Sequence, residues 1–326
     1  MYLINNSAST APRVLITGDT GFVGQHVLAS WSGAVGLSTL APQLDIRDKA
    51  ELLACLHGFR PSAVLHLAAL SFVPDSFRSP EATFEVNFLG TLRLLEALAE
   101  TGFKGRFVFV GSADAYGLVP AGSLPIKEDH PLRPRNPYAV SKAAAEALCF
   151  QWSQTGPFEV MMARPFNHLG AGQAPTFSIS SFAQQIAEIA AGRRPPTLSV
   201  GDLEVTRDFV DVADVVSAYR LILAHGQNGE IYNVCSGLER PLRTLLESLL
   251  SLSGVSAELV RDPARCRPFE QARVCGSPKK LSDHTGWQPR VPMDQTLAAI
   301  YRYWTQAGSP PGQRNCPAKA DGMHGA

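Results

Sequence analysis

A strand-like run that ends in a glycine-rich turn constrains the fold of this chain most strongly. Residues 13–17 (RVLIT) are apolar and β-branched, and they lead directly into Gly18–Gly24 (GDTGFVG). The residues from Gly24 to Trp31 then have a helical pattern. A strand, a turn with three spaced glycines and a helix form the first unit of a dinucleotide-binding fold, in which phosphate oxygens face the helix N-terminus. We therefore expect a dinucleotide site at this turn.

Further apolar strands alternate with helices in the first half of the chain. The expected strands cover Ala63–Ala68, Phe107–Gly111 and Glu159–Arg164, and the expected helices cover Pro80–Thr101 and Tyr138–Trp152. Near-continuous apolar strands of this kind are buried on both faces of a parallel sheet. The pattern predicts the α/β class, with a doubly wound parallel Rossmann sheet.

The second half of the chain is less regular, because prolines interrupt it and its short strands look isolated. The strand-like Glu230–Val234 is expected to rejoin the main sheet. We predict a Rossmann domain, a smaller C-terminal substrate-binding α/β domain and a disordered tail. The Rossmann domain covers residues 12–168, with a return segment near 207–235. The substrate-binding domain covers residues 169–206 and 236–305, and the tail covers residues 307–326.

Composition narrows the classes of function. The chain has 326 residues, is 45% hydrophobic, and carries 29 basic and 29 acidic side chains that cancel. This balance gives no electrostatic reason to expect a nucleic-acid or membrane partner. No secretory leader or long apolar span is evident, so a cytoplasmic location is expected. The six cysteines form no Cys-x-x-Cys pair, and we predict no metal.

The turn and the region after it supply candidate contacts to the cofactor. Gly18 permits a tight turn, Gly21 allows backbone approach to the pyrophosphate, and Gly24 allows close helix–sheet packing. We include the intervening Thr20, Phe22 and Val23 in the site.

The cofactor itself stays open between NADPH and NADH. Residues 35–40 (VGLSTL) contain neither the acid nor the arginine that usually discriminates between them. Ser38 or Thr39 can donate to a 2′-phosphate or serve a bare ribose. Asp45 can accept from the adenine amino group and Ile46 can pack on the ring; the alternative is that Asp45 is a loop acid before a helix.

A proton-transfer group is expected on the helix that begins after Asn136 and Pro137, a helix cap and a first-turn proline. Tyr138 and Lys142 lie four residues apart and so share a helix face. An ammonium group near the phenol is expected to lower the pKa of Tyr138 and prepare it to exchange a proton. Ser112, at the end of the expected strand 107–111, can hydrogen-bond the reacting oxygen.

These motifs together resemble the extended short-chain dehydrogenase/reductase family, which is also called the nucleotide-sugar epimerase/dehydratase family. The resemblance spans about Arg13 to Trp304. It is carried by Gly18–Gly24, Asp45–Ile46, His66–Ala69 (HLAA), Asn87–Thr91 (NFLGT), Ser112–Gly117 (SADAYG) and Tyr138–Lys142. It implies cofactor contacts from Leu67, Ala68 and Ala69, and a homodimer formed through the helices at Pro80–Thr101 and Tyr138–Trp152.

Within that family the chain is similar to the GDP-sugar branch, so a small nucleotide-sugar substrate is expected. The similarity is carried by Arg164–His168 (RPFNH), Gly201–Leu203 (GDL), Arg207–Phe209 (RDF) and Arg267–Glu270 (RPFE). It implies that Asn167, Arg207 and Arg267 hold the diphosphate, that Glu270 holds the ribose, and that Ser71 touches the hexose. The alternative for the arginines is a surface ion pair, and for His66 and His168 a packing role.

The branch contains both reductases and 4,6-dehydratases. A dehydratase needs a further acid/base, and its Thr-x-Glu pattern is replaced here by Ser112, Ala113 and Asp114. We therefore expect a reductase that converts the C4 ketone of GDP-4-keto-6-deoxy-D-mannose to GDP-D-rhamnose, with Ser112, Asp114, Tyr138 and Lys142 as catalytic residues. The alternatives are a dehydratase, an epimerase or a related reductase, and a non-catalytic NAD(P)-binding regulatory dimer.

Overall fold

The computed structural model describes residues 13–265 and 271–307, which form two compact units. The first unit contains 13–168, 205–240 and 271–291, and the second contains 169–204, 241–265 and 292–307. The predicted range of 236–305 for the substrate-binding domain differs from this division, because residues 236–240 and 271–291 belong to the first unit. Two isolated bridges, Ile126 with Gly276 and Thr206 with Arg273, explain why the segment after 271 does so.

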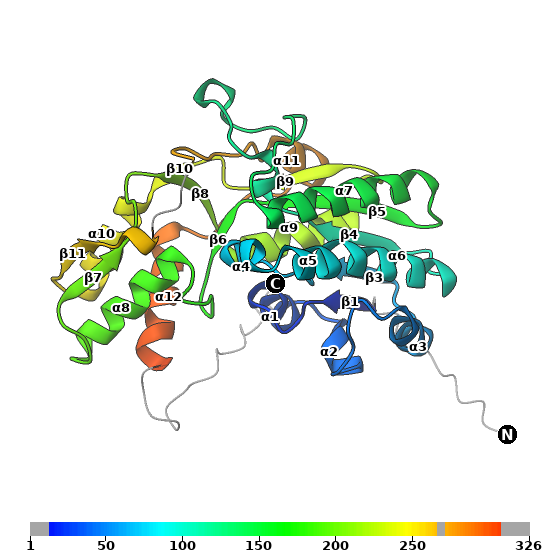
Figure 1. The fold of residues 1–326 in the computed structure, drawn as a ribbon, viewed down its shortest axis with the longest axis horizontal. Helices are drawn as coiled ribbons and strands as arrows, with labels where there is room; N and C mark the ends of the chain where they lie inside the picture. Colours follow the sequence, from blue (N-terminus) through cyan, green and yellow to red (C-terminus); the bar gives the residue numbers. More distant parts are fainter. Residues whose placement is uncertain (1–12, 266–270, 308–326) are drawn as a thin grey trace, which may run out of the picture. The chain divides into compact units, whose positions relative to one another are not determined.

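A six-stranded parallel sheet forms the centre of the first unit, as predicted (Figure 1). Its strand order is β2-β1-β3-β4-β5-β9, and every pairing between neighbours is parallel. The segment expected to rejoin the sheet does so as β9, beside β5. The strands are β1 (Val14–Thr17), β2 (Ala34–Gly36), β3 (Ala63–His66), β4 (Arg106–Val110), β5 (Glu159–Pro165) and β9 (Ile231–Val234).

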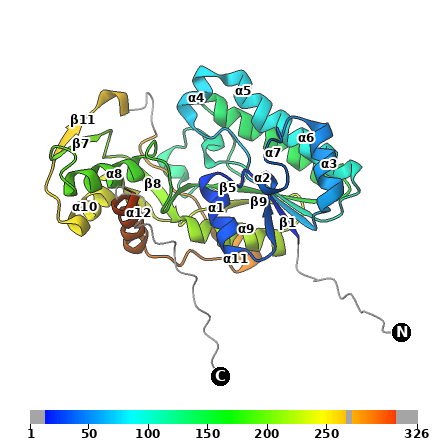
Figure 2. The ribbon, with the colours of Figure 1, turned by 90° about the horizontal axis from the view of Figure 1, so that it is seen from below.

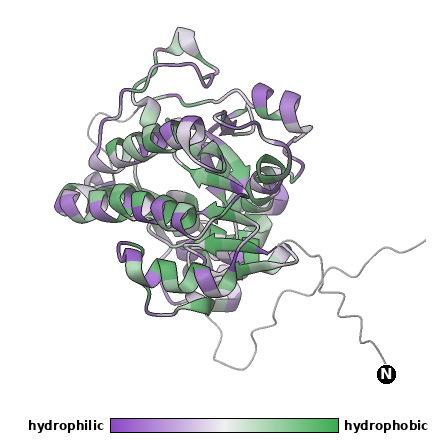
Figure 3. Cartoon of the chain, turned by 90° about the vertical axis from the view of Figure 1, so that its right-hand side faces the viewer, coloured by the Kyte–Doolittle hydropathy of each residue, from purple (hydrophilic) through white to green (hydrophobic). Residues whose placement is uncertain are grey.

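Helices cover both faces of this sheet (Figure 2). One face carries α1 (Phe22–Ser30), α9 (Val212–His225) and α11 (Lys279–Thr285), and the other carries α3 (Lys49–Phe59), α6 (Gly90–Glu100) and α7 (Pro137–Thr155). The alternation along a strand explains the two cores: Val14 and Ile16 join one, whereas Leu15 joins the other. Figure 3 shows the hydrophobic strands of the sheet in green, beside helices with purple polar faces.

The helix predicted over Pro80–Thr101 is divided in the structure. It consists of α5 (Pro80–Phe84), a π-helical segment η1 (Glu85–Leu89) and α6. The wider turn contains Asn87, whose side chain accepts from the backbone N–H of Leu70 at 2.8 Å and donates to its carbonyl at 3.1 Å. Such π-helical turns are frequent at functional sites, and this one fixes the loop that follows β3.

Short elements complete the first unit. They are α2 (Leu37–Leu40), α4 (Val73–Arg78), η2 (Ala113–Tyr116), η3 (Ala121–Ser123) and a three-stranded sheet in the order β10-β8-β6, built from β6 (Asn167–Leu169), β8 (Thr206–Asp211) and β10 (Glu239–Pro241). Leu169 and Pro241, at the ends of two of these strands, belong to the second unit.

The second unit is a small α/β assembly. Its helices are α8 (Ser178–Ala190), α10 (Leu242–Ser253), η4 (Pro263–Arg265) and α12 (Met293–Ala307), and its strands are β7 (Thr197–Val200) and β11 (Glu258–Arg261). The two strands that looked isolated in sequence pair with each other in parallel. Ala307 still belongs to α12, so the tail predicted from residue 307 begins inside a helix, and residues 308–326 lie outside the described residues. Among the described helices, none combines the length and apolarity needed to cross a bilayer.

Candidate active site

The strand order locates a ligand site on the sheet of the first unit. From β1 the chain passes to β2 on one side, and from β2 it crosses to β3 on the other side of β1, so the direction in which strands are added reverses at β1. In open parallel sheets, ligands bind outside the carboxyl ends of the strands at such a switch point. The carboxyl ends of β1 and β3 lead to Gly18 and Leu67, which bring the glycine turn and the segment after β3 together.

Two glycines of the turn, Gly18 and Gly24, lie where a side chain would collide with the backbone. Gly18 has a positive φ of 68°, and a Cβ there would lie 2.6 Å from the backbone nitrogen of Ala68. A Cβ at Gly24 would overlap the carbonyl of Gly18 and the backbone of Asp19. Gly24 therefore permits close packing of α1 on the turn that follows β1.

The first turn of α1 offers unpaired donors to an anion. The helix begins at Phe22, and its N-cap residue Gly21 supplies no side-chain hydrogen bond. The N–H groups of Phe22, Val23 and Gly24 are the first three of this helix, which have no partner within a helix. The exposed Thr20 precedes them, and its carbonyl accepts from Gln25. The glycine turn leaves room for a ligand beside the N-terminus of α1, whose first N–H groups point outward. This arrangement fits a dinucleotide pyrophosphate.

The segment after β3 forms the second wall. Leu67 donates its N–H to the carbonyl of Thr17 at 3.1 Å, and Ala68 donates to the Thr17 hydroxyl at 3.2 Å. Asn87 holds Leu70 from the other side and also donates to Ser141 on α7 at 2.9 Å. The predicted contacts Leu67, Ala68 and Ala69 are thus fixed between β1 and α7. Asn87 is a positioning residue to which the sequence pattern alone assigned no role.

Two histidines near the site have packing roles. His66 is buried between the hydroxyls of Thr17 at 2.7 Å and Thr91 at 2.9 Å, and burial lowers its pKa to about 3. The ring of His168 stacks on Phe22, with 6.1 Å between ring centroids. Burial also lowers the pKa of His168. Both side chains therefore favour the neutral form.

The predicted adenine contacts lie in different environments. Asp45 is exposed, and its carboxylate accepts from the Arg47 guanidinium at 2.6 Å, which lowers the pKa of Asp45. Arg47 also reaches Glu85 at 2.6 Å. Ile46 is buried, and a Cβ at Gly90 would lie 2.7 Å from its Cγ2 atom. Asp45 thus faces solvent with an arginine partner, while Ile46 belongs to the core.

The structure brings the three predicted proton-transfer residues together at the end of β4. Asn136 caps α7 by accepting from the N–H of Ala139 at 2.7 Å. One turn apart on α7, Tyr138 hydrogen-bonds Ser112, and Lys142 donates to the carbonyl of Val110 at 2.7 Å. Lys142 is nearly inaccessible, with 4% of its surface exposed.

The charge states differ from the prediction for one residue. Burial raises the pKa of Tyr138, and the Asp114 carboxylate raises it further, against the hydrogen bond with Ser112. The predicted lowering of the Tyr138 pKa by Lys142 is therefore wrong for this structure, in which the lysine ammonium bonds a backbone carbonyl. Burial lowers the pKa of Lys142 to about 8. A protonated tyrosine is suited to act as an acid.

A buried ion pair supports α7 from below. Arg164 on β5 donates to Glu146 on α7 at 2.6 and 2.7 Å, to the Tyr116 hydroxyl at 2.7 Å and to the carbonyl of Glu128 at 3.0 Å. The Tyr116 hydroxyl in turn donates to the Asn233 side chain on β9 at 2.7 Å. Glu146 lies one turn beyond Lys142, which is the sequence signal that could have pointed to it. The network links α7, which carries Tyr138 and Lys142, to β5, β9 and the short helix η2.

The predicted substrate residues are only partly described. Asn167 on β6 and Arg207 on β8 lie on neighbouring strands of the three-stranded sheet. Arg207 is half-buried and donates to the carbonyl of Thr206 at 2.7 Å. Ser71 is exposed in the segment before α4. Arg267 and Glu270 lie outside the described residues.

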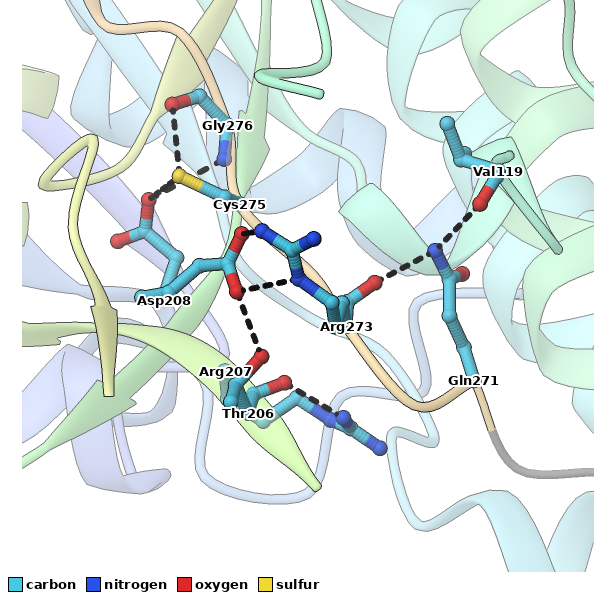
Figure 4. A network of polar contacts seen from close by, with 9 residues as sticks. Val119, Thr206, Arg207, Asp208, Gln271, Arg273, Cys275 and Gly276 are labelled. Carbon is cyan, nitrogen blue, oxygen red and sulfur yellow. Dashed lines mark hydrogen bonds and ion pairs between the residues drawn. The ribbon is translucent and has the colours of Figure 1, made fainter. Parts of the chain in front are cut away.

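A polar network fixes the strand that carries Arg207 (Figure 4). The buried carboxylate of Asp208 accepts from the N–H of Gly276 at 3.2 Å and from the Cys275 thiol at 3.9 Å. Glu239 accepts from Arg273 at 2.7 Å and from Thr206 at 2.9 Å. These bonds hold β8 against the segment after residue 271. In the described residues no group of three His, Cys, Asp or Glu side chains could hold a metal ion, and the absence of a metal stays a prediction.

Comparison with known proteins identifies the family. Residues 38–300 match the family model described as GDP-mannose 4,6 dehydratase. The chain is 48% identical over 294 residues to a GDP-6-deoxy-D-mannose reductase from Pseudomonas aeruginosa strain PAO1, which covers 90% of this chain and 97% of that protein. It is 28% identical over 287 residues to a GDP-mannose 4,6-dehydratase from Yersinia enterocolitica, covering 78% of this chain and 76% of that one.

Solved structures agree with this assignment. The structure of RMD from Pseudomonas aeruginosa complexed with NADPH superimposes with a TM-score of 0.86 at 44% identity, covering 91% of this chain and 99% of that chain. A Thermus thermophilus UDP-glucose 4-epimerase in complex with NAD gives a TM-score of 0.78 at 32% identity, covering 90% and 98%. The predicted enzyme class is confirmed. The chain belongs to the GDP-mannose 4,6-dehydratase family of extended short-chain dehydrogenases/reductases.

Proposed function

We propose that this protein reduces the C4 ketone of GDP-4-keto-6-deoxy-D-mannose to GDP-D-rhamnose with NADPH or NADH. One observation carries the proposal: Tyr138 is kept protonated beside Ser112, at the end of β4, in a chain 48% identical to a GDP-6-deoxy-D-mannose reductase over 97% of its length. A ketone reduction needs a proton donor at the carbonyl oxygen, and a neutral phenol is one.

When bound, the reduced nicotinamide supplies a hydride to the C4 carbon. Tyr138 donates its phenolic proton to the C4 oxygen, so that the carbonyl becomes a secondary alcohol. Ser112 donates a hydrogen bond to the same oxygen and stabilises its developing negative charge. Lys142, one helix turn from Tyr138, donates from its ammonium group to the hydroxyls of the nicotinamide ribose.

The substrate contacts follow from residue chemistry. Guanidinium groups bind phosphate oxygens with two parallel hydrogen bonds, which suits Arg207 and Arg267 for the diphosphate beside Asn167. Glu270 accepts from the ribose hydroxyls, and Ser71 touches the hexose. Asn167 and Arg207 lie on adjacent strands, which supports the proposal that both contact the diphosphate.

A 4,6-dehydratase is the second candidate because one observation favours it. Asp114 is exposed, yet its charge acts on Tyr138, so a carboxylate stands close to the proton-transfer group. A dehydratase needs such a further acid/base for the C5 proton and the C6 hydroxyl. The side chain is one methylene shorter than the glutamate of the dehydratase pattern, which disfavours that reaction.

The test follows nicotinamide absorbance while the purified protein is incubated with GDP-4-keto-6-deoxy-D-mannose and either reduced cofactor. Stoichiometric oxidation and formation of GDP-rhamnose are expected. GDP-mannose without added reductant is the parallel substrate. Its conversion, with no cofactor oxidation by the ketosugar, would establish the dehydratase instead.

We also propose a cytoplasmic homodimer. The layer formed by η1, α6 and α7 exposes Leu89, Val140 and Phe150, which a second copy would cover. A cytoplasmic location suits a reaction that consumes reduced nicotinamide. Light scattering of the purified chain measures the mass, and Val140→Asp with Phe150→Asp is expected to give a monomer. A wild-type monomer at micromolar concentration would contradict the dimer.

A further inference from the structure

The region that discriminates between NADH and NADPH contains an acid that the sequence pattern did not indicate. The ribose of the adenosine half is held by a residue about 20 positions after the first glycine, at the end of the second strand. Counted from Gly18, that position is occupied by Ser38, in the first turn of α2. The carboxylate of Asp19 reaches it from the glycine turn.

Asp19 is only 4% exposed and packs against the end of β2. A Cβ at Gly36 would overlap its carboxylate, so the glycine there makes room for the acid. One carboxylate oxygen accepts from the Ser38 N–H at 3.1 Å, and the other accepts from the Ser38 hydroxyl. Although no acid follows β2 in sequence, a carboxylate lies there in space.

These bonds determine what Ser38 can offer a ligand. A serine hydroxyl has one donor hydrogen and two acceptor lone pairs. Since Asp19 accepts that hydrogen and also the backbone N–H, Ser38 is left with an acceptor. A ribose 2′-hydroxyl can donate to this acceptor, whereas a 2′-phosphate, which carries only acceptor oxygens at neutral pH, cannot.

The surrounding charge acts in the same direction. The carboxylate of Asp19 is one hydrogen bond away from the ligand position and repels a phosphate dianion. Residues 37–45 (LSTLAPQLD) contain no lysine or arginine. The first cation after them, Arg47, already pairs with Asp45 and Glu85. Thr39 is the exposed hydroxyl beside Ser38.

We propose that Asp19 is a specificity-determining positioning residue that acts through Ser38 to select NADH over NADPH. The inference deepens the proposed reductase function, since it names the cofactor of the same site. It also distinguishes this chain from one relative of known structure, the RMD from Pseudomonas aeruginosa, which was solved in complex with NADPH.

The experiment measures cofactor binding to the full chain by titration calorimetry, with NADH and NADPH and no sugar substrate. We expect NADH to bind at least about tenfold more tightly, the factor expected from one charge-assisted hydrogen bond. In Asp19→Asn the amide carries no charge, and its NH2 group can donate to Ser38, which frees the serine hydroxyl to donate. The dissociation constant of NADPH divided by that of NADH is expected to be about tenfold lower in this variant than in the wild type.

The matched control is Asp48→Asn. Asp48 also accepts backbone N–H groups at a helix start, from Ala50 at 2.9 Å and Glu51 at 3.1 Å, but it lies at α3. This substitution should leave the ratio unchanged. If Asp19→Asn does not fold, Ser38→Ala serves instead, and it should weaken NADH binding more than NADPH binding.

The inference is overturned if the wild type binds NADPH as tightly as NADH, or if neither Asp19→Asn nor Ser38→Ala alters the ratio. Because no substrate is present, this result is independent of the reductase proposal. If the protein selects NADH but does not convert the ketosugar, the role of Asp19 is supported and the proposed reductase function is contradicted.

Discussion

The two ends of the proposed cofactor site each contain an arginine paired with a carboxylate, but in opposite environments. At the nicotinamide end, the side chains of Arg164 and Glu146 are 3% and 6% exposed. At the adenosine end, those of Arg47 and Asp45 are 44% and 46% exposed. Loss of one partner leaves an uncompensated charge in the interior at the first end and a hydrated charge at the second.

This difference indicates how the two ends are specialised. The buried network around Arg164 and Glu146 fixes the position of α7, so Tyr138 and Lys142 are held in place independently of residues on the surface. At the adenosine end, selectivity depends on few bonds, chiefly those of Asp19 with Ser38. Single substitutions should therefore change cofactor choice at one end and abolish chemistry or stability at the other.

The largest effect is expected from Tyr138→Phe, which removes the proton donor and keeps the ring. Turnover of GDP-4-keto-6-deoxy-D-mannose should fall by about 10²- to 10⁴-fold, the usual contribution of general acid catalysis. Cofactor affinity and unfolding midpoint should change little. Steady-state kinetics and calorimetry on the same preparation measure both. A variant that retains most of its turnover would remove Tyr138 from the mechanism.

The second-largest effect is expected from Arg164→Met, because it leaves the Glu146 carboxylate buried without its partner. We expect a loss of about 3–5 kcal/mol in the free energy of unfolding, measured with urea. The double variant with Glu146→Leu removes the orphaned charge and should recover part of the loss. If the double variant is no more stable than the single one, the charge is not the cause.

The third effect depends on pH. Burial lowers the pKa of Lys142 to about 8 from an ordinary 10.5. Between these values the unfolded chain binds a proton that the folded chain does not, so stability rises with pH across this window. Relative to Lys142→Met, the wild type should gain up to about 3 kcal/mol between pH 8 and pH 10.5. Parallel urea titrations measure the difference, and equal slopes for the two proteins would contradict the lowered pKa.

The sequence was sufficient wherever spacing alone determines geometry. Tyr138 and Lys142 share a face because a helix repeats every four residues or so, and the glycine turn follows a strand directly. The charge of Tyr138 could not be inferred in this way, because it depends on burial and on Asp114. Local patterns do not report how deeply a side chain is covered.

Contacts between distant segments explain the other omissions. Asp19 reaches Ser38 because Gly36 leaves room for it, which no periodicity reveals. Asn87 lies in a π-helical turn and bonds the backbone of Leu70, a contact that the helical sequence pattern does not indicate. Residues 271–291 join the first unit through strand bridges that have no sequence signature.

The smallest effect should come from Arg47→Gln at the exposed end. Exposed ion pairs contribute little to stability, because water and salt screen them and long side chains lose entropy when they pair. We expect an unfolding midpoint within the scatter of repeated measurements, and no change in turnover. If Arg47→Gln destabilised the protein as much as Arg164→Met, exposure would not distinguish the two pairs, and the specialisation of the two ends would need another cause. A weaker affinity for both cofactors equally would instead assign Arg47 to holding Asp45 at the adenine.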